Sequence, residues 1–132
     1  MKSILEYLKK EYYSKCAERY PNFSVTDEQI MALLAMCEDR TIVIRNPDIK
    51  CVAIYLTLTD ETYDNISQDK IMDVKELSVM LQEKGCNFHF FLISAVGFRN
   101  IRIGMMEVKK LNPKTVSWYN PDMTQLHQYS LN

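Results

Sequence analysis

The stretch NFHFFLISAVGFRNIRIGM, from Asn87 to Met105, constrains the fold more than any other part of the chain. Its first half, Phe88 to Val96, is a nearly continuous apolar run, which is typical of a strand covered on both faces and predicts a strand in the middle of a sheet. Gly97 then predicts a turn, and the residues after it predict a short helix from about Asn100 to Lys110. A helix that begins directly after a buried strand points unpaired backbone N–H groups, backed by the helix dipole, at the turn.

Arg99 and Arg102 add two positive charges at the start of this predicted helix. Free backbone N–H groups and guanidinium groups together favour a phosphate or pyrophosphate ligand. The alternative is that both arginines are solvated side chains on an ordinary helix surface.

The residues before this stretch predict two helices and a hairpin. Apolar residues recur at three- and four-residue steps from Ser3 to about Arg19, which is the pattern of an amphipathic helix. Thr26 followed by Gln29 predicts a capping box at the start of a second helix. Two segments rich in β-branched residues, Thr41 to Arg45 and Cys51 to Leu58, flank a turn of asparagine, proline and aspartate, and they predict an antiparallel hairpin.

The remaining segments complete the predicted domain. The polar residues from Thr59 to Asp73 predict a surface excursion with one helical turn, and Val74 to Leu81 predicts a helix that Gly85 closes in a left-handed conformation. Thr115 to Tyr119 and Thr124 to Leu131 predict two further strands. The order of elements indicates a single domain over residues 1–132, of the α+β class, with a mixed α/β sheet and helices packed against it.

Composition narrows the classes of partner and compartment. The net charge is -1 and the pI is near 6.1, which gives no reason to expect nucleic acid or an anionic membrane as a partner. The sequence has neither a signal peptide nor an apolar run long enough to span a membrane, so we expect a cytoplasmic protein. The cysteines are far apart and form no metal-binding spacing, so we expect no metal site and free thiols instead: Cys16, Cys37, Cys51 and Cys86.

A central strand that leads through a phosphate-type turn into a helix resembles the GNAT superfamily of acyl-CoA N-acyltransferases, in particular its shortened, phage-associated members. That family carries the motif Gln/Arg-x-x-Gly-x-Gly/Ala at the helix start, and here the matching segment is Arg99-Asn100-Ile101-Arg102-Ile103-Gly104. The arginine and the last glycine fit the motif. Arg102 stands where the family has glycine, so its side chain either obstructs the phosphate or supplies a guanidinium to it. The resemblance implies a GNAT-like fold with a largely antiparallel central sheet flanked by helices.

The resemblance also implies a binding site for acyl-CoA, with acetyl-CoA as the expected form and no metal. Arg99, Asn100, Arg102 and Gly104 would contact the pyrophosphate. The backbone of the central strand at Ser94, Ala95 and Val96 would pair with the pantetheine amides, and an N–H of Ala95 or Val96 would hold the oxyanion.

Candidate groups for proton transfer are few. The resemblance places Tyr119 near the position of a tyrosine that returns a proton to the leaving thiolate; the alternative is an aromatic residue that caps the strand beside Trp118. The central strand contains no acidic residue between Phe88 and Val96, and we interpret its His89 as a core residue rather than a general base.

Two functions follow, from different classes. The first is a GNAT-like N-acyltransferase that moves an acyl group from acyl-CoA to an amine on a small molecule or a protein. The alternative is a catalytically inactive GNAT-fold binding module with a closed groove, which the missing glycine and missing acid favour. An open cleft between residues 88–96 and 115–119 would count against that alternative. A nucleic-acid accessory role is disfavoured by the overall acidity, and the sequence leaves open whether the chain is a monomer or a homodimer.

Overall fold

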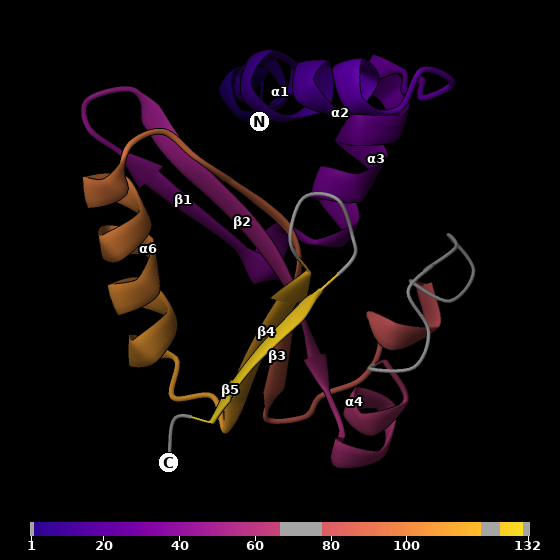
Figure 1. Ribbon diagram of the computed structural model, residues 1–132, viewed down its shortest axis with the longest axis vertical. Coiled ribbons are helices and arrows are strands. Elements are labelled where there is room, and N and C mark those ends of the chain that lie inside the picture. Colours follow the sequence, from indigo (N-terminus) through magenta and orange to yellow (C-terminus); the bar gives the residue numbers. More distant parts are fainter. Residues whose placement is uncertain (1, 67–77, 120–124, 131–132) are drawn as a thin grey trace.

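The computed structural model describes residues 2–66, 78–119 and 125–130, which form an α+β domain around one five-stranded sheet (Figure 1). The strands lie in the sheet in chain order, and the third strand is therefore central. Their bounds are β1 Thr41–Arg45, β2 Ile49–Leu58, β3 Asn87–Ala95, β4 Thr115–Tyr119 and β5 Leu126–Ser130. The expected central strand and the expected hairpin of β1 and β2 are confirmed, and the two further predicted strands are present as β4 and β5.

The sheet is mixed, which corrects the expectation of a largely antiparallel sheet. β1 pairs with β2, β2 with β3, and β4 with β5 in antiparallel fashion, whereas β3 and β4 are parallel. The parallel pair arises because helix α6, Phe98–Lys110, connects the end of β3 to the start of β4, and parallel strands need such a crossover. Strand direction thus alternates across the sheet except between β3 and β4.

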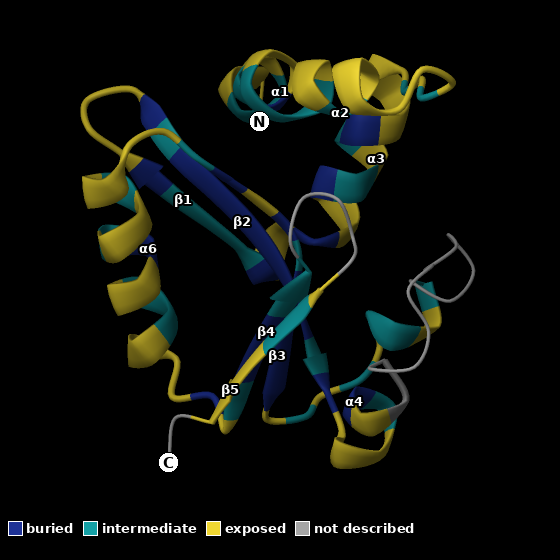
Figure 2. Cartoon of the chain, in the orientation of Figure 1, coloured by how far each residue is buried: buried dark blue, intermediate teal, exposed yellow. Residues whose placement is uncertain are grey.

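The first face of the sheet is covered by the N-terminal helices (Figure 2). These are α1 Lys2–Leu8, the π-helical turn η1 Lys9–Tyr13, α2 Ser14–Arg19, α3 Asp27–Met36 and the 3-10 turn η2 Glu38–Arg40. The predicted capping box is present: Thr26 Oγ1 accepts from the N–H of Gln29, and the Gln29 side chain accepts from the N–H of Thr26 at 2.9 Å. The core beneath these helices consists of Leu8, Ile30, Leu34, Cys37, Ile49, Val52, Ile54 and Leu92.

The second face of the sheet is covered by α6 alone among the described elements. Because side chains alternate along a strand, Ala53 and Tyr55 of β2 point to this face while Ile54 points to the first. α6 begins at Phe98, two residues before the predicted start, and its 13 residues make it longer than expected. It ends as predicted before Asn112 and Pro113, where Asn112 adopts a left-handed φ of 56°.

The polar excursion after β2 contains α4, Asp60–Ile66, as expected. Of the predicted helix at 74–81, the residues up to 77 lie outside the described part of the chain, and residues 78–80 are helical. Gly85 does not serve as the left-handed helix end that we predicted. Instead it packs against the end of β2, where an added Cβ would lie only 1.9 Å from the Leu58 carbonyl oxygen, so glycine is needed for close approach.

Candidate functional site

A cleft opens on the second face because β3 leaves β4 halfway along its length. The parallel pairing runs from Asn87 opposite Thr115 to Phe90 opposite Trp118, and within the described residues it ends there. At the same point the pairing of β3 with β2 shifts: Tyr55 faces Phe90 and Ile54 faces Leu92. β3 therefore carries one extra residue, and such a bulge bends a strand. The second half of β3 continues with β2 and separates from β4.

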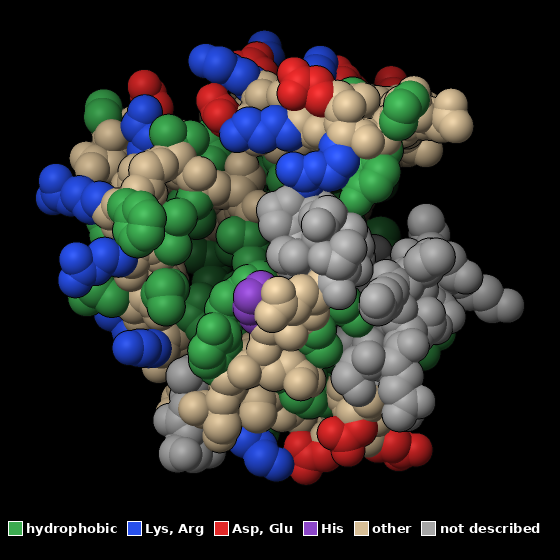
Figure 3. All heavy atoms as spheres, viewed as in Figure 1, with side chains coloured by type: hydrophobic (Ala, Val, Ile, Leu, Met, Phe, Trp, Pro, Cys, Tyr) green, Lys and Arg blue, Asp and Glu red, His purple; other side chains and the backbone are tan. Residues whose placement is uncertain are grey.

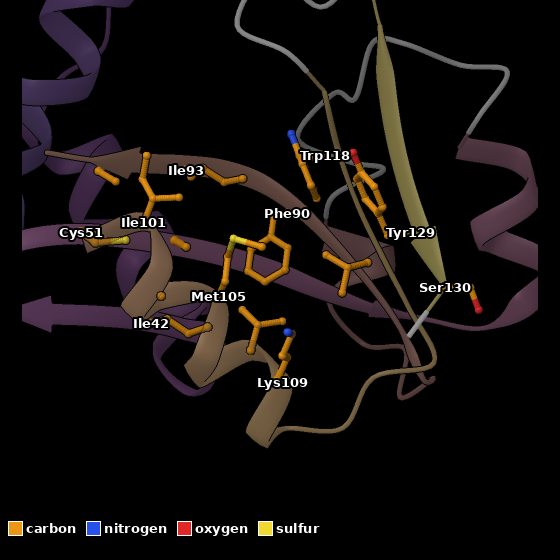
Figure 4. Close-up of a pocket in the computed structure, with 15 residues that line it drawn as sticks. Ile42, Cys51, Phe90, Ile93, Ile101, Met105, Lys109, Trp118, Tyr129 and Ser130 are labelled. Atoms are coloured by element: carbon orange, nitrogen blue, oxygen red, sulfur yellow. The ribbon is translucent and has the colours of Figure 1, made fainter. Parts of the chain in front are cut away.

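The cleft left by this separation has a volume of about 710 Å³ and lies between α6 and the β4–β5 hairpin (Figure 3). Hydrophobic side chains form most of its walls. In Figure 4, Met105 of α6 points toward Phe90 of β3 and Ile101 lies on the side of Ile93, while Trp118 and Tyr129 form the opposite wall. The lining comprises Ile42, Cys51, Ala53, Phe90, Ile93, Ala95, Ile101, Gly104, Met105, Val108, Lys109, Val116, Trp118, Tyr129 and Ser130.

The backbone of β3 offers polar groups at the opened edge. The N–H of Val96 donates to the Lys50 carbonyl at 2.8 Å, so this group is engaged with β2. Backbone groups of successive residues in a strand point to alternate edges. The N–H and C=O of Ala95 and Ile93 therefore point away from β2, to the edge beyond the last described pair with β4. Both side chains also line the cleft.

The three predicted pantetheine-contacting residues thus have different positions. Ala95 lies at the cleft, and Val96 uses its N–H within the sheet. Ser94 is buried on the first face. Its carbonyl oxygen accepts a hydrogen bond from the Tyr7 hydroxyl at 3.1 Å, and its own hydroxyl donates to the Tyr7 hydroxyl oxygen at 3.3 Å. Burial raises the pKa of Tyr7, so this phenol remains a hydrogen-bond donor.

The start of α6 lies at one end of the cleft. Gly97 precedes the helix with a φ of 85°, a conformation that favours glycine, and the N–H of Ile101 donates to its carbonyl at 3.3 Å. The first helical N–H groups, from Phe98 to Asn100, have no partner within a regular helix. The Asn100 side chain folds back and donates to the Val96 carbonyl at 2.6 Å.

Arg99 and Arg102 are exposed, and neither is among the described residues that line the cleft. Gly104 lies farther along α6, on its buried side against the Cys51 sulfur. An added Cβ there would make an ordinary contact with the Cys51 sulfur at 3.5 Å, and the residue is too far into the helix to present a free N–H. The predicted pyrophosphate residues therefore divide into a solvent-facing group at the helix start and a packing glycine.

Tyr119 does not share a face of the sheet with the cleft. Trp118 lines the cleft, so its neighbour Tyr119 points to the first face, where its ring packs edge-on against His89 at 5.8 Å. His89 is 1% exposed and its Nδ1 lies 2.8 Å from the Ser117 hydroxyl. Burial lowers the pKa of His89 to about 4, so the ring is neutral at physiological pH and belongs to the core.

Two aromatic residues of the cleft wall were missed as site residues from the sequence. These residues are Trp118 and Tyr129. Their rings stack at 5.3 Å with a 19° angle between planes, and the Trp118 ring stacks on His127 at 5.5 Å. Alternation along the last two predicted strands would have placed them on one face, but which face lines a cleft depends on where β3 bends.

The cleft offers few reactive side chains. Burial raises the pKa of the Cys51 thiol, so this cysteine is protonated and a poor nucleophile. Lys109 and the hydroxyls of Tyr129 and Ser130 are the other polar side chains named in the lining. Among the described residues, no group of three or more histidine, cysteine or acidic side chains could hold a metal ion. The site is suited to binding an apolar group rather than to nucleophilic catalysis by a side chain.

Comparison with models of known protein families, with curated proteins and with solved structures found no match for this chain. Within the described part of the chain, no helix has both the length and the apolar character required to cross a membrane. The functional argument therefore depends on the geometry of the cleft.

Proposed function

We propose that the chain is a GNAT-like protein that binds acyl-CoA in the cleft of the second face and transfers the acyl group to an amine. The observation that carries this proposal is the cleft between α6 and the β4–β5 hairpin, with a volume of about 710 Å³ and a helix start at one end. An open cleft between residues 88–96 and 115–119 is the feature that separates this function from a closed-groove module. It therefore favours a ligand-binding protein.

The backbone of β3 supports binding of the pantetheine arm. Ile93 and Ala95 direct their N–H and C=O groups to the opened edge, where an amide-containing chain can pair with them as an added strand would. The same N–H groups can stabilise the oxyanion that forms when an amine attacks the thioester carbonyl. In this proposal catalysis comes from positioning the two reactants and stabilising the oxyanion, because the cleft supplies no buried general base.

The start of α6 supports binding of the phosphates. The unpaired N–H groups of Phe98 to Asn100 and the exposed side chains of Arg99 and Arg102 attract an anion without burying a charge. Lys50 is held near this end by the hydrogen bond between its carbonyl and the N–H of Val96. The expected order along the ligand is phosphates at the helix start and the acyl group within the cleft.

A second candidate is a GNAT-fold module that binds the same ligand without turnover. The positions of Tyr119 and His89 favour it, because both lie on the first face, away from the cleft. The two candidates agree on binding and differ on transfer.

The binding step is tested by calorimetry with acetyl-CoA and with free coenzyme A. We expect saturable binding that weakens at least fivefold in Arg99→Ala. The matched control is Arg19→Ala, which removes an exposed arginine from α2 and should leave binding unchanged, because α2 lies apart from α6 and the β4–β5 hairpin in Figure 1. No heat of binding at millimolar ligand would refute both candidates.

The transfer step is tested by thiol release from acetyl-CoA in the presence of a polyamine or a lysine-containing peptide. Amine-dependent release above the background rate supports the transferase. Binding without any amine-dependent release, across several classes of amine, supports the module instead.

A further inference from the structure

The solvent-facing side of α6 carries large apolar side chains that no other described element covers. Phe98 is 84% exposed, and Met105 and Met106 are 53% and 60% exposed. Ile101 is exposed as well. Steps of three and four residues join Phe98, Ile101 and Met105, so these side chains share one side of a helix whose 13 residues extend about 20 Å. Neighbouring exposed apolar side chains of this kind indicate an interaction surface.

The other exposed residues of α6 are all basic: Arg99, Arg102, Lys109 and Lys110. The acidic residue of the helix, Glu107, is half-buried and pairs with Lys110, with 3.0 Å between Nζ and Oε1. Among the described residues, the other three basic side chains form no ion pair. These four basic residues and the four apolar residues form what we call the α6 surface. It is locally positive although the whole chain has a net charge of -1.

The turn between β1 and β2 lies beside the start of α6 (Figure 1), where the N–H of Val96 donates to the Lys50 carbonyl. This turn adds the exposed Arg45 and one exposed acid, Asp48. Figure 3 shows Lys and Arg side chains along the outer side of α6, with hydrophobic side chains between them and the cleft. The positive charge and the apolar side chains therefore face the same solvent.

The N-terminal helices present a different surface to water. Between residues 2 and 19, the exposed side chains include none that is apolar and larger than alanine, and their charges have both signs. Lys9 pairs with Asp27 at 3.1 Å and Lys15 with Glu11 at 4.0 Å. Such a surface is suited to water alone. The α6 surface, in contrast, suits a partner that is both apolar and negatively charged.

We propose that the α6 surface binds the headgroup region of a lipid bilayer that contains anionic lipids. A helix with apolar and basic side chains exposed together lies in the plane of such an interface, and its apolar groups enter the acyl boundary. The aliphatic stems of Arg102 and Lys109 can lie along the apolar groups while their charged ends reach lipid phosphates. A folded protein would need a pocket shaped for the projecting Phe98, whereas a lipid surface adapts to it.

The experiment measures co-sedimentation of the intact chain with two sets of vesicles. One set is phosphatidylcholine alone, and the other contains about one-third phosphatidylserine. We expect binding to the anionic vesicles to be at least tenfold stronger at low salt, because each basic residue near such a surface contributes about fivefold. Binding should weaken as salt is added. Equal binding to the two sets, or binding to neither, would overturn the proposal.

Two pairs of exposed residues locate the contact. Met106→Ser should weaken binding to the anionic vesicles by roughly fivefold. Its matched control is Met36→Ser, which changes a methionine that is 47% exposed at the end of α3 and should leave binding unchanged. Arg102→Gln should weaken binding by about fivefold, and Arg19→Gln on α2 should not. Full binding in both Met106→Ser and Arg102→Gln would contradict the proposal.

Other occupants of the α6 surface are tested with the same variants. A dimer in sedimentation velocity that Met106→Ser dissociates would assign the surface to a second copy of the chain and overturn the lipid proposal. Binding to soluble polyglutamate as tight as to anionic vesicles, and equally tight in Met106→Ser, would show that charge alone acts and would also overturn it. Met106 is not among the described residues that line the cleft, so acetyl-CoA affinity should be unchanged in Met106→Ser. Loss of lipid binding is thereby distinguished from loss of the proposed function.

Discussion

The two faces of the sheet are built from similar residues, but helices cover them to different extents. On the first face, α1 to α3 bury Leu8, Ile30 and Ile54 to 1% exposure or less. On the second face, α6 covers β1 and β2 but leaves the area over the end of β3 open, and Ile101 and Met105 at its edge are 42% and 53% exposed. The same strands thus carry a dry core on one side and a cleft on the other.

This difference indicates a division between stability and binding. Apolar side chains on the first face have already lost their contact with water, so their stabilisation belongs to folding. Apolar side chains around the cleft remain partly hydrated, and a ligand that covers them gains the free energy of that burial. The predictions below test this division, from the largest expected effect to the smallest.

The largest effect should come from Gly85→Ala, at the contact between Gly85 and the end of β2. The added Cβ would lie 1.9 Å from the Leu58 carbonyl oxygen and 2.5 Å from the Thr59 nitrogen, and both are backbone atoms that cannot move alone. We expect a loss of more than about 4 kcal/mol in the free energy of unfolding, measured by urea denaturation. A loss below 1 kcal/mol would show that β2 and the segment at Gly85 are not held together in this way.

Truncation of a core residue should cost more than truncation of a cleft residue of the same type. Ile54→Ala should lower the free energy of unfolding by about 2–5 kcal/mol, because Ile54 is fully buried. Ile101→Ala, on the exposed edge of α6, should change it by less than about 0.5 kcal/mol. Denaturant titration of both variants makes the comparison, and equal losses would erase the distinction between the faces.

Stability should fall as the pH is lowered from 6.5 toward 4, because of His89 on the first face. Burial lowers the pKa of His89 from 6.5 to about 4. Between these pH values the unfolded chain therefore binds a proton that the folded chain does not bind. The stabilisation is complete above pH 6.5 and decreases by about 3 kcal/mol by pH 4.

Urea denaturation at several pH values checks this dependence. His89→Asn should flatten the profile between pH 6.5 and 4, whereas His127→Gln on β5 should leave it as in the wild type. The hydrogen bond from Asn87 and the interaction with Lys114 lower the pKa of Asp60. Its contribution to stability is therefore lost only at a lower pH, as the carboxylate protonates below the ordinary pKa of an aspartate. An unchanged profile in His89→Asn would contradict the account of this histidine.

The smallest effect should be a gain, at Gly104 of α6. A Cβ there would lie 3.5 Å from the Cys51 sulfur, an ordinary contact, and the residue is inside a helix. Gly104→Ala should therefore raise the free energy of unfolding by up to about 1 kcal/mol, seen as a higher Tm. A clear loss would mean that α6 packs more tightly on the second face than these contacts indicate.

Local patterns made most of the fold predictable from the sequence. The nearly continuous apolar run at 88–96, interrupted only by His89 and Ser94, identified the central strand because a strand buried on both faces carries few polar residues. Thr26 and Gln29 fixed the start of α3 because the capping box is made within four residues. Gly85 was misinterpreted because its role is a contact with Leu58, distant in sequence. Such long-range contacts leave no local pattern.

The candidate site was less predictable for the same reason. Of the segment 94–104, Ala95, Ile101 and Gly104 line the cleft, whereas Ser94, Arg99 and Arg102 do not. The opposite wall of Trp118 and Tyr129 depends on the extra residue that bends β3 away from β4, and the apolar run at 88–96 gives no sign of where that bend occurs. The face on which Tyr119 lies follows from the same geometry.

The most direct test of the cleft as a binding site uses Trp118, the single tryptophan of the chain, which forms part of its wall. Tryptophan emission is measured as acetyl-CoA is titrated into the protein. The account predicts a saturable change in emission that Met105→Glu weakens and Met106→Glu does not. If calorimetry detects binding while the emission spectrum stays constant, the ligand binds elsewhere and the account is contradicted.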